Sequence, residues 1–145
     1  MSKLDLGNFG QHFINEQFEM IYKATSKDFQ QLLGLNEFQH ICHSFKKGVK
    51  SLERFSEKEW FGTTQVIWVD KTKQKAIQLA YESNQVITGF YLKSLNTYDS
   101  DKKWTKNQYR MPIRDEWFVF WGGTNEFDNY HYAYENQRYA YDLVR

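Results

Sequence analysis

Apolar residues in the first third of the chain recur at helical spacing. Between residues 8 and 23 they return every three or four positions, as at Ile14 and Phe18, which predicts one amphipathic helix. Two more helices are predicted at residues 25–34 and 36–48, because each begins with a capping residue and ends at a glycine. The predicted core face of the third helix consists of Phe38, Ile41, Cys42 and Phe45.

After residue 48 the hydrophobic period changes from helical to alternating. This change predicts four strands, at residues 49–55, 63–70, 74–82 and 85–93. The connections between the later strands are short and polar, so we expect antiparallel hairpins. Helices followed by an antiparallel meander predict an α+β domain, with N-terminal helices packed on a curved sheet, over residues 1–95.

The segment at residues 96–115 is the predicted linker. It is rich in charged residues, and the only proline of the chain, Pro112, lies near its end. Its basic residues lie close to Trp104 and Tyr109, a combination that is compatible with nucleic-acid stacking. A solvated linker with anchoring aromatic residues is the favoured interpretation.

The C-terminal segment, residues 116–145, contains two predicted strands. An apolar run at residues 117–121 ends at a glycine pair and predicts a strand buried on both faces. In a second strand at residues 138–144, Asp142 shares a face with small apolar residues. A half-buried carboxylate needs a cation, a metal ion or several hydrogen-bond donors.

Two interpretations of Asp142 remain open on the residues alone. In the simpler one, Arg138 or the backbone satisfies the carboxylate, and His131 is a polar loop residue. In the other, His131 and Asp142 are two ligands of one metal site, a nitrogen and an oxygen donor suited to zinc.

The string WGGTNEFDNYHYAYENQRYAYDLV, residues 121–144, resembles the start of the catalytic domain of lysostaphin-type zinc endopeptidases, which cut peptide bonds in bacterial cell-wall peptidoglycan. The resemblance implies that His131 is the first zinc ligand and Asp142 the second. In that family a later His-x-His supplies the third ligand and a catalytic histidine. No histidine follows His131 in this sequence. The resemblance therefore implies an incomplete peptidase domain that is inactive by itself, with zinc bound weakly or only in a complete relative.

The string FEMIYKATSKDFQQLLGLNEF, residues 18–38, together with the order of elements, resembles the small cone-shaped domains of the nuclear-transport-factor and ketosteroid-isomerase superfamily. The resemblance implies a cystatin-like or cone-like sheet. Together with the resemblance of residues 121–144 to lysostaphin-type peptidases, it implies that the chain is an accessory N-terminal region of a bacterial wall hydrolase. Two alternatives stay open. One is a free-standing small-molecule binder with a pocket lined by Phe18, Tyr22 and Phe90, and the other is a protein-interaction module.

Charge and composition narrow the range of partners. The chain has 19 basic and 18 acidic residues, and its net charge of +1 gives no reason to expect nucleic acid or an anionic membrane. Peptidoglycan, or a downstream peptidase domain, is the expected partner. Residues 1–10 show no secretion signal, so the chain as written is expected in the cytoplasm. An extracellular or cell-wall location is expected if a signal segment has been removed.

Two further groups of residues carry chemistry that could form a site. His40, Cys42 and His43 lie within four residues, but Cys42 belongs to the predicted core face, so a structural role is favoured over a metal site. Asp70 could place an acid at a pocket mouth, yet it opens a polar turn, and a role in stabilising that turn is favoured.

Overall fold

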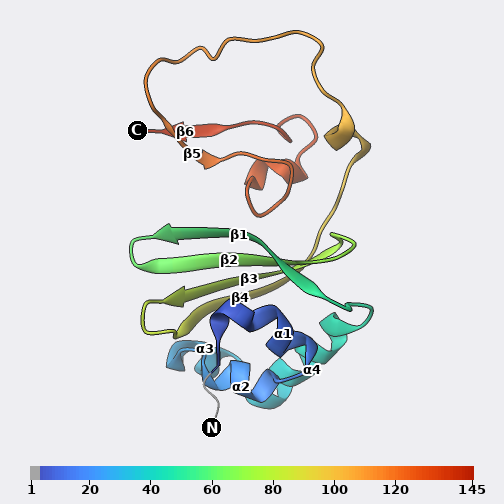
Figure 1. Cartoon of the computed structure of the whole chain (residues 1–145), viewed down its shortest axis with the longest axis vertical. Helices are drawn as coiled ribbons and strands as arrows, with labels where there is room; N and C mark the ends of the chain where they lie inside the picture. The colour runs from blue at the N-terminus through green and yellow to red at the C-terminus, as the bar shows by residue number, and fades with distance from the viewer. Residues whose placement is uncertain (1–3) are drawn as a thin grey trace. The chain divides into compact units, whose positions relative to one another are not determined.

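The contacts of the computed structural model, which describes residues 4–145, divide the chain into two units, Met1–Ser94 and Leu95–Arg145 (Figure 1). We call these the N-terminal unit and the C-terminal unit. Both helices and strands are present, and the N-terminal unit combines short helices with a four-stranded antiparallel sheet. The predicted α+β class is therefore confirmed.

The sheet of the N-terminal unit is a meander in which each strand pairs with its neighbour in sequence. Its strands, in spatial order, are β1 (Leu52–Trp60), β2 (Thr63–Asp70), β3 (Lys75–Glu82) and β4 (Ile87–Ser94). All three pairings are antiparallel, as the short connections predicted. The first strand was predicted at residues 49–55 and actually runs further, past a bulge between Arg54 and Ser56. The bulge and the run of charged residues after it hide the alternation from the sequence pattern.

The hairpin between β1 and β2 turns through Phe61 and Gly62. Both residues have positive φ, 47° and 78°, as a two-residue turn of the type that matches strand twist requires. Phe61 is 93% exposed in this conformation, which is costly for a residue with a large side chain.

Four short α-helices precede the sheet and cover one of its faces (Figure 1). They follow a 3-10 turn, η1 (Leu6–Asn8), and are α1 (Phe9–Ile14), α2 (Phe18–Lys23), α3 (Lys27–Leu32) and α4 (Leu35–Lys46).

The single helix predicted over residues 8–23 is wrong, because the chain breaks between α1 and α2. Glu16, at the break, has a φ of 59°. Phe13 and Phe18 are five residues apart, which would place them about 140° apart around a continuous helix. The break lets both rings enter the core, where their centroids are 5.0 Å apart.

The boundaries of the other two helices also differ from the prediction. Ser26, not Thr25, caps α3, since its hydroxyl accepts a hydrogen bond from the backbone N–H of Phe29. Gly34 was expected to end this helix and instead caps the start of α4. Ile41 was placed on the core face of α4 but is 39% exposed, whereas Cys42 is fully buried.

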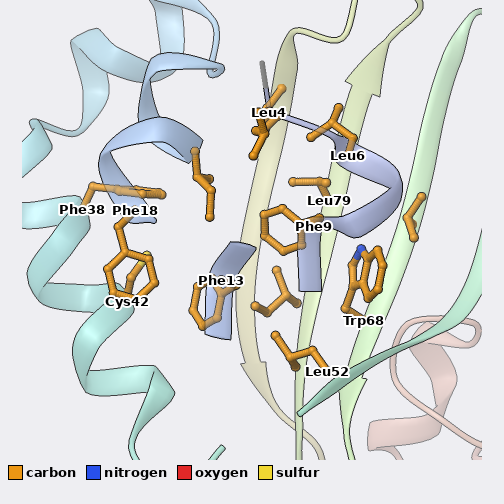
Figure 2. Close-up of a cluster of buried hydrophobic side chains, with 14 of the residues drawn as sticks. Leu4, Leu6, Phe9, Phe13, Phe18, Phe38, Cys42, Leu52, Trp68 and Leu79 are labelled. Carbon is orange, nitrogen blue, oxygen red and sulfur yellow. The ribbon is translucent and has the colours of Figure 1, made fainter. Parts of the chain in front are cut away.

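The core of the N-terminal unit lies between the helices and the sheet (Figure 2). Phe9 and Phe13 of α1 are fully buried, and the Phe9 ring packs 6.0 Å from the Trp68 ring of β2. Leu79 of β3 is also fully buried. Apolar area removed from water in this layer provides the main stabilising free energy of the unit.

The segment between α2 and α3 pairs with the outer edge of β4. Thr25 and Ile87 form a parallel bridge, in which the Ser26 N–H donates to the Ile87 carbonyl and the Ile87 N–H donates to the Ala24 carbonyl. The backbone groups at the start of β4 therefore have partners on both sides of the strand.

The C-terminal unit contains one two-stranded sheet and two 3-10 turns. Its elements are η2 (Asp99–Lys102), β5 (Phe118–Trp121), η3 (Tyr130–Ala133) and β6 (Asp142–Val144). Only Asp142, Leu143 and Val144 pair with β5, so the strand predicted at residues 138–144 is wrong in its first half. The prediction that the apolar run is buried on both faces is also wrong. Phe118, Val119 and Phe120 are exposed, because the two-stranded sheet has too few neighbours to cover both faces.

Among the residues that the structure describes, no helix is both long enough and apolar enough to cross a membrane.

Candidate metal-binding site

His131 and Asp142, the two residues that the sequence singled out, lie side by side in the C-terminal unit. His131 lies in η3 and Asp142 is the first residue of β6. Successive turns between them, including the Tyr134 N–H to His131 carbonyl and the Ala140 N–H to Gln137 carbonyl hydrogen bonds, return the chain to its starting point. As a result, His131 Nε2 is 3.1 Å from Asp142 Oδ1.

The immediate surroundings of the imidazole fix its orientation. The Tyr130 ring lies against one face of the His131 ring, with centroids 3.9 Å apart. On the other side of the ring from Asp142, Nδ1 is 2.9 Å from Gln137 Oε1. Only 11% of the His131 side chain is exposed, against 41% of the Asp142 side chain. The pair therefore opens to solvent on the carboxylate side.

The contacts of both ring nitrogens determine the charge of His131. The hydrogen bond to Asp142 raises the pKa of His131, burial opposes this shift, and the hydrogen bond to Gln137 adds to it. Both neighbours accept hydrogen bonds in this arrangement, so the imidazolium, with two N–H groups, satisfies them together. Deprotonation of Nε2 would free a lone pair that points towards the Asp142 carboxylate.

This donor pair has the chemistry and spacing of two zinc ligands. Two ligands at about 2.0–2.1 Å from one tetrahedral zinc ion lie about 3.3 Å from each other. The 3.1 Å separation of Nε2 and Oδ1 is close to that value. Gln137 also occupies the position of the outer partner that metal-binding histidines commonly have on their second nitrogen. Within residues 4–145, no third His, Cys, Asp or Glu completes a metal-binding group.

Arg138, which the simpler interpretation placed on Asp142, makes other contacts. Its Nε donates to the Tyr132 carbonyl at 3.2 Å, and its guanidinium carbon lies 3.4 Å from the centre of the Tyr98 ring. The partner of Asp142 in this structure is His131.

The loop that carries His131 is tied to the start of the unit by Asp101. The hydroxyls of Tyr132 and Tyr139 donate to the two oxygens of this carboxylate at 2.5 and 2.6 Å. Burial alone would raise the pKa of Asp101, but these two hydrogen bonds, the Tyr98 backbone N–H and the charge of Arg138 together outweigh it and lower the pKa. Part of the segment predicted as a linker thus packs on the tail through η2.

Sequence reasoning missed two residues of the site, Asn129 and Gln137. Asn129 is fully buried, and its side-chain oxygen accepts a hydrogen bond from the His131 N–H at 3.1 Å. Its position two residues before His131, at the start of a turn, is the available sequence signal, because asparagine often bonds the backbone two residues ahead. Gln137 is exposed and gives no comparable signal.

The other candidate residues belong to the N-terminal unit, whereas His131 and Asp142 belong to the C-terminal unit. Cys42 is buried in the core of the N-terminal unit, while His40 is exposed and the His43 ring packs edge-on against Phe18. Asp70 accepts hydrogen bonds from the Gln74 and Lys75 backbone N–H groups, which confirms its role in the turn.

The residues expected to line a pocket in the N-terminal unit pack against other rings. Phe18 is buried against Phe13, and the Tyr22 and Phe90 rings both pack against Phe38, at 5.4 and 5.1 Å. A surface depression of about 310 Å³ lies elsewhere, at the end of α4. Its lining residues are Glu16, His43, Lys46, Lys47, Gly48, Val49 and Lys50.

Neither a protein-family model, nor a curated protein, nor a solved structure matches this chain.

Proposed function

We propose that the C-terminal unit is the first part of a zinc peptidase domain of the lysostaphin type, in which His131 and Asp142 are two of the three protein ligands. The 3.1 Å approach of Nε2 to Oδ1 is the observation that carries the proposal. A hydrolytic zinc site needs a third protein ligand and an open position for water, which the metal activates for attack on a peptide bond. The third ligand and a catalytic histidine come from outside these 145 residues, so this chain alone is inactive.

In this proposal the N-terminal unit is an accessory domain with a cone-like sheet that positions the peptidase at bacterial peptidoglycan. Its meander over short helices and its filled aromatic core support a packed scaffold rather than a small-molecule binder. A protein-interaction role is the second candidate, and the exposed Phe61 at a strained hairpin tip favours it.

Zinc titration of the metal-free chain tests the ligand assignment. We expect weak binding of one ZnCl₂ equivalent that is lost in His131→Ala and in Asp142→Ala. His40→Ala is the matched control, since it removes an exposed histidine from the N-terminal unit and should leave binding unchanged. Zinc binding that survives in the folded His131→Ala variant would refute the assignment.

Peptidoglycan binding tests the second half of the proposal. Purified chain should sediment with insoluble peptidoglycan without releasing peptide fragments from it. A chain that stays in the supernatant over the same concentration range as an unrelated control protein would remove the support for a wall-directed role.

A further inference from the structure

The buried side chain of Asn129 lies within hydrogen-bond distance of four backbone groups from separate parts of the C-terminal unit. Its Nδ2 group carries two hydrogens and lies within hydrogen-bond distance of three carbonyls, those of Gly123, Arg138 and Ala140, at 3.2, 3.2 and 3.0 Å, so one hydrogen is shared between two of them. Its Oδ1 accepts from the His131 N–H at 3.1 Å. The side chain is fully buried, so each of these bonds is shielded from competing water.

These four bonds join the three chain segments that define the site. Gly123 follows β5, and His131 lies in η3. Ala140 lies two residues before Asp142. The segments around Gly123 and Ala140 lie outside the strand pairing of β5 and β6, so these side-chain bonds add to the backbone turns that bring His131 to Asp142.

The chemistry at this position requires an amide. One planar group must accept a hydrogen bond on one atom and donate to several carbonyls from another, which a carboxylate or a hydroxyl of similar size cannot do. A carboxylate would place its second oxygen against three carbonyl oxygens. The hydrogen-bonding pattern therefore requires the amide group of asparagine, and a side chain of equal volume would not replace it.

We infer that Asn129 is a positioning residue, which holds His131 and Asp142 at the separation that two ligands of one metal ion need. The use of this arrangement in zinc binding rests on the proposed function. The positioning itself involves no metal. Loss of Asn129 should loosen the His131 to Asp142 contact before it unfolds the unit.

A double-mutant cycle without metal measures the coupling between His131 and Asp142 directly. In the full chain, His131→Ala and Asp142→Ala should be non-additive, with a coupling factor of about three in the unfolding equilibrium constant, as for a partly exposed ion pair. In the Asn129→Ala background the factor should fall to about one. Asn125→Ala is the matched control, because Asn125 also bonds nearby backbone N–H groups, those of Phe127 and Asp128, but contacts neither donor of the site.

A ZnCl₂ titration adds the link to metal binding. Asn129→Ala should weaken zinc binding by about tenfold, the lower end of the effect of outer-shell substitutions at metal sites. Asn125→Ala should bind zinc like the wild type. Undiminished coupling in folded Asn129→Ala, or an equal loss of coupling in both variants, would overturn the positioning role.

Two further measurements cover the case in which Asn129→Ala fails to fold. Asn129→Ser keeps an acceptor for the His131 N–H but cannot reach the three carbonyls, and it should show the same loss of coupling. In the wild type, the His131 amide hydrogen should exchange slowly, because its bond to Asn129 Oδ1 is buried. A fast-exchanging His131 amide would refute the inference. A wild type that shows the coupling but binds no zinc would refute the proposed function alone.

Discussion

Replacing Gly10 with alanine should destabilise the N-terminal unit through a single misplaced methyl group. Gly10 is buried in α1, next to Leu52 of β1 and Trp68 of β2. A Cβ atom at this position would lie 2.8 Å from the Leu52 carbonyl oxygen and 2.9 Å from Cε3 of Trp68. The carbonyl belongs to β1 and cannot move without disturbing the strand pairing, so the helix must shift instead.

The size of the effect follows from two opposing terms. Overpacking of a well-filled core costs about 1–3 kcal/mol. Alanine is favoured over glycine by up to about 1 kcal/mol inside a helix, but Gly10 lies in the first turn, where the gain is smaller. The net loss is about 1–2 kcal/mol, which for a unit of this size lowers the melting temperature by roughly 4–16 °C.

Differential scanning calorimetry of the full chain measures this shift. Gly34→Ala is the control, since a Cβ at Gly34 meets nothing within 4 Å and its φ of −74° suits alanine. Its cost, the loss of a glycine N-cap, is less than about 1 kcal/mol. Equal melting temperatures for Gly10→Ala and Gly34→Ala would show that α1 does not pack this closely on β1 and β2.

Three titratable groups, Asp70, His131 and Cys42, provide the remaining predictions. Burial alone would raise the pKa of Asp70, but hydrogen bonds from the Thr72 hydroxyl and from backbone N–H groups outweigh it and lower the pKa. Asp70→Asn should therefore cost about 1–2 kcal/mol at neutral pH, and urea titrations should show the cost disappearing as the pH falls from the ordinary value of 3.8 through the lowered pKa. The pKa of His131 is raised above 6.5, so the stability from its Asp142 contact is full below pH 6.5 and is lost as the pH rises through the raised pKa. Zinc binding needs the neutral ring and should strengthen over the same interval in a pH series of ZnCl₂ titrations, whereas pH-independent binding would contradict the ligand assignment. Burial raises the pKa of Cys42 to about 12, so mass spectrometry should find this thiol unmodified by iodoacetamide at pH 8 until the chain is unfolded.

The sequence pattern predicted those parts of the fold that depend on local periodicity. Alternation and short polar connections identified the strand pairs, because hairpins join neighbours in sequence. The break at Glu16 was missed, since helical spacing of apolar residues continues across it and only the packing of Phe13 and Phe18 requires it. The apolar run before Gly122 suggested burial, but the number of strands available to cover a face is a tertiary property.

In the candidate site, too, some residues could be predicted from the sequence and others could not. His131 and Asp142 could be chosen because imidazole and carboxylate side chains are common metal ligands, and the structure brings the two together. Asn129 could not, because three of its four side-chain bonds go to backbone carbonyls, which every residue has and no sequence pattern marks. Which carbonyls meet at Asn129 depends on the path of the whole loop.

The bridge between Thr25 and Ile87 also leaves less of the outer edge of β4 open to another molecule. An unpaired strand edge is a template on which a second molecule can add its own strand, the first step of fibril growth. Residues 24–26 occupy that template where β4 begins, so a neighbouring molecule would have to displace them before it could dock there. The short segment between α2 and α3 thus covers the edge of β4 at this end of the strand and hinders strand pairing between molecules there.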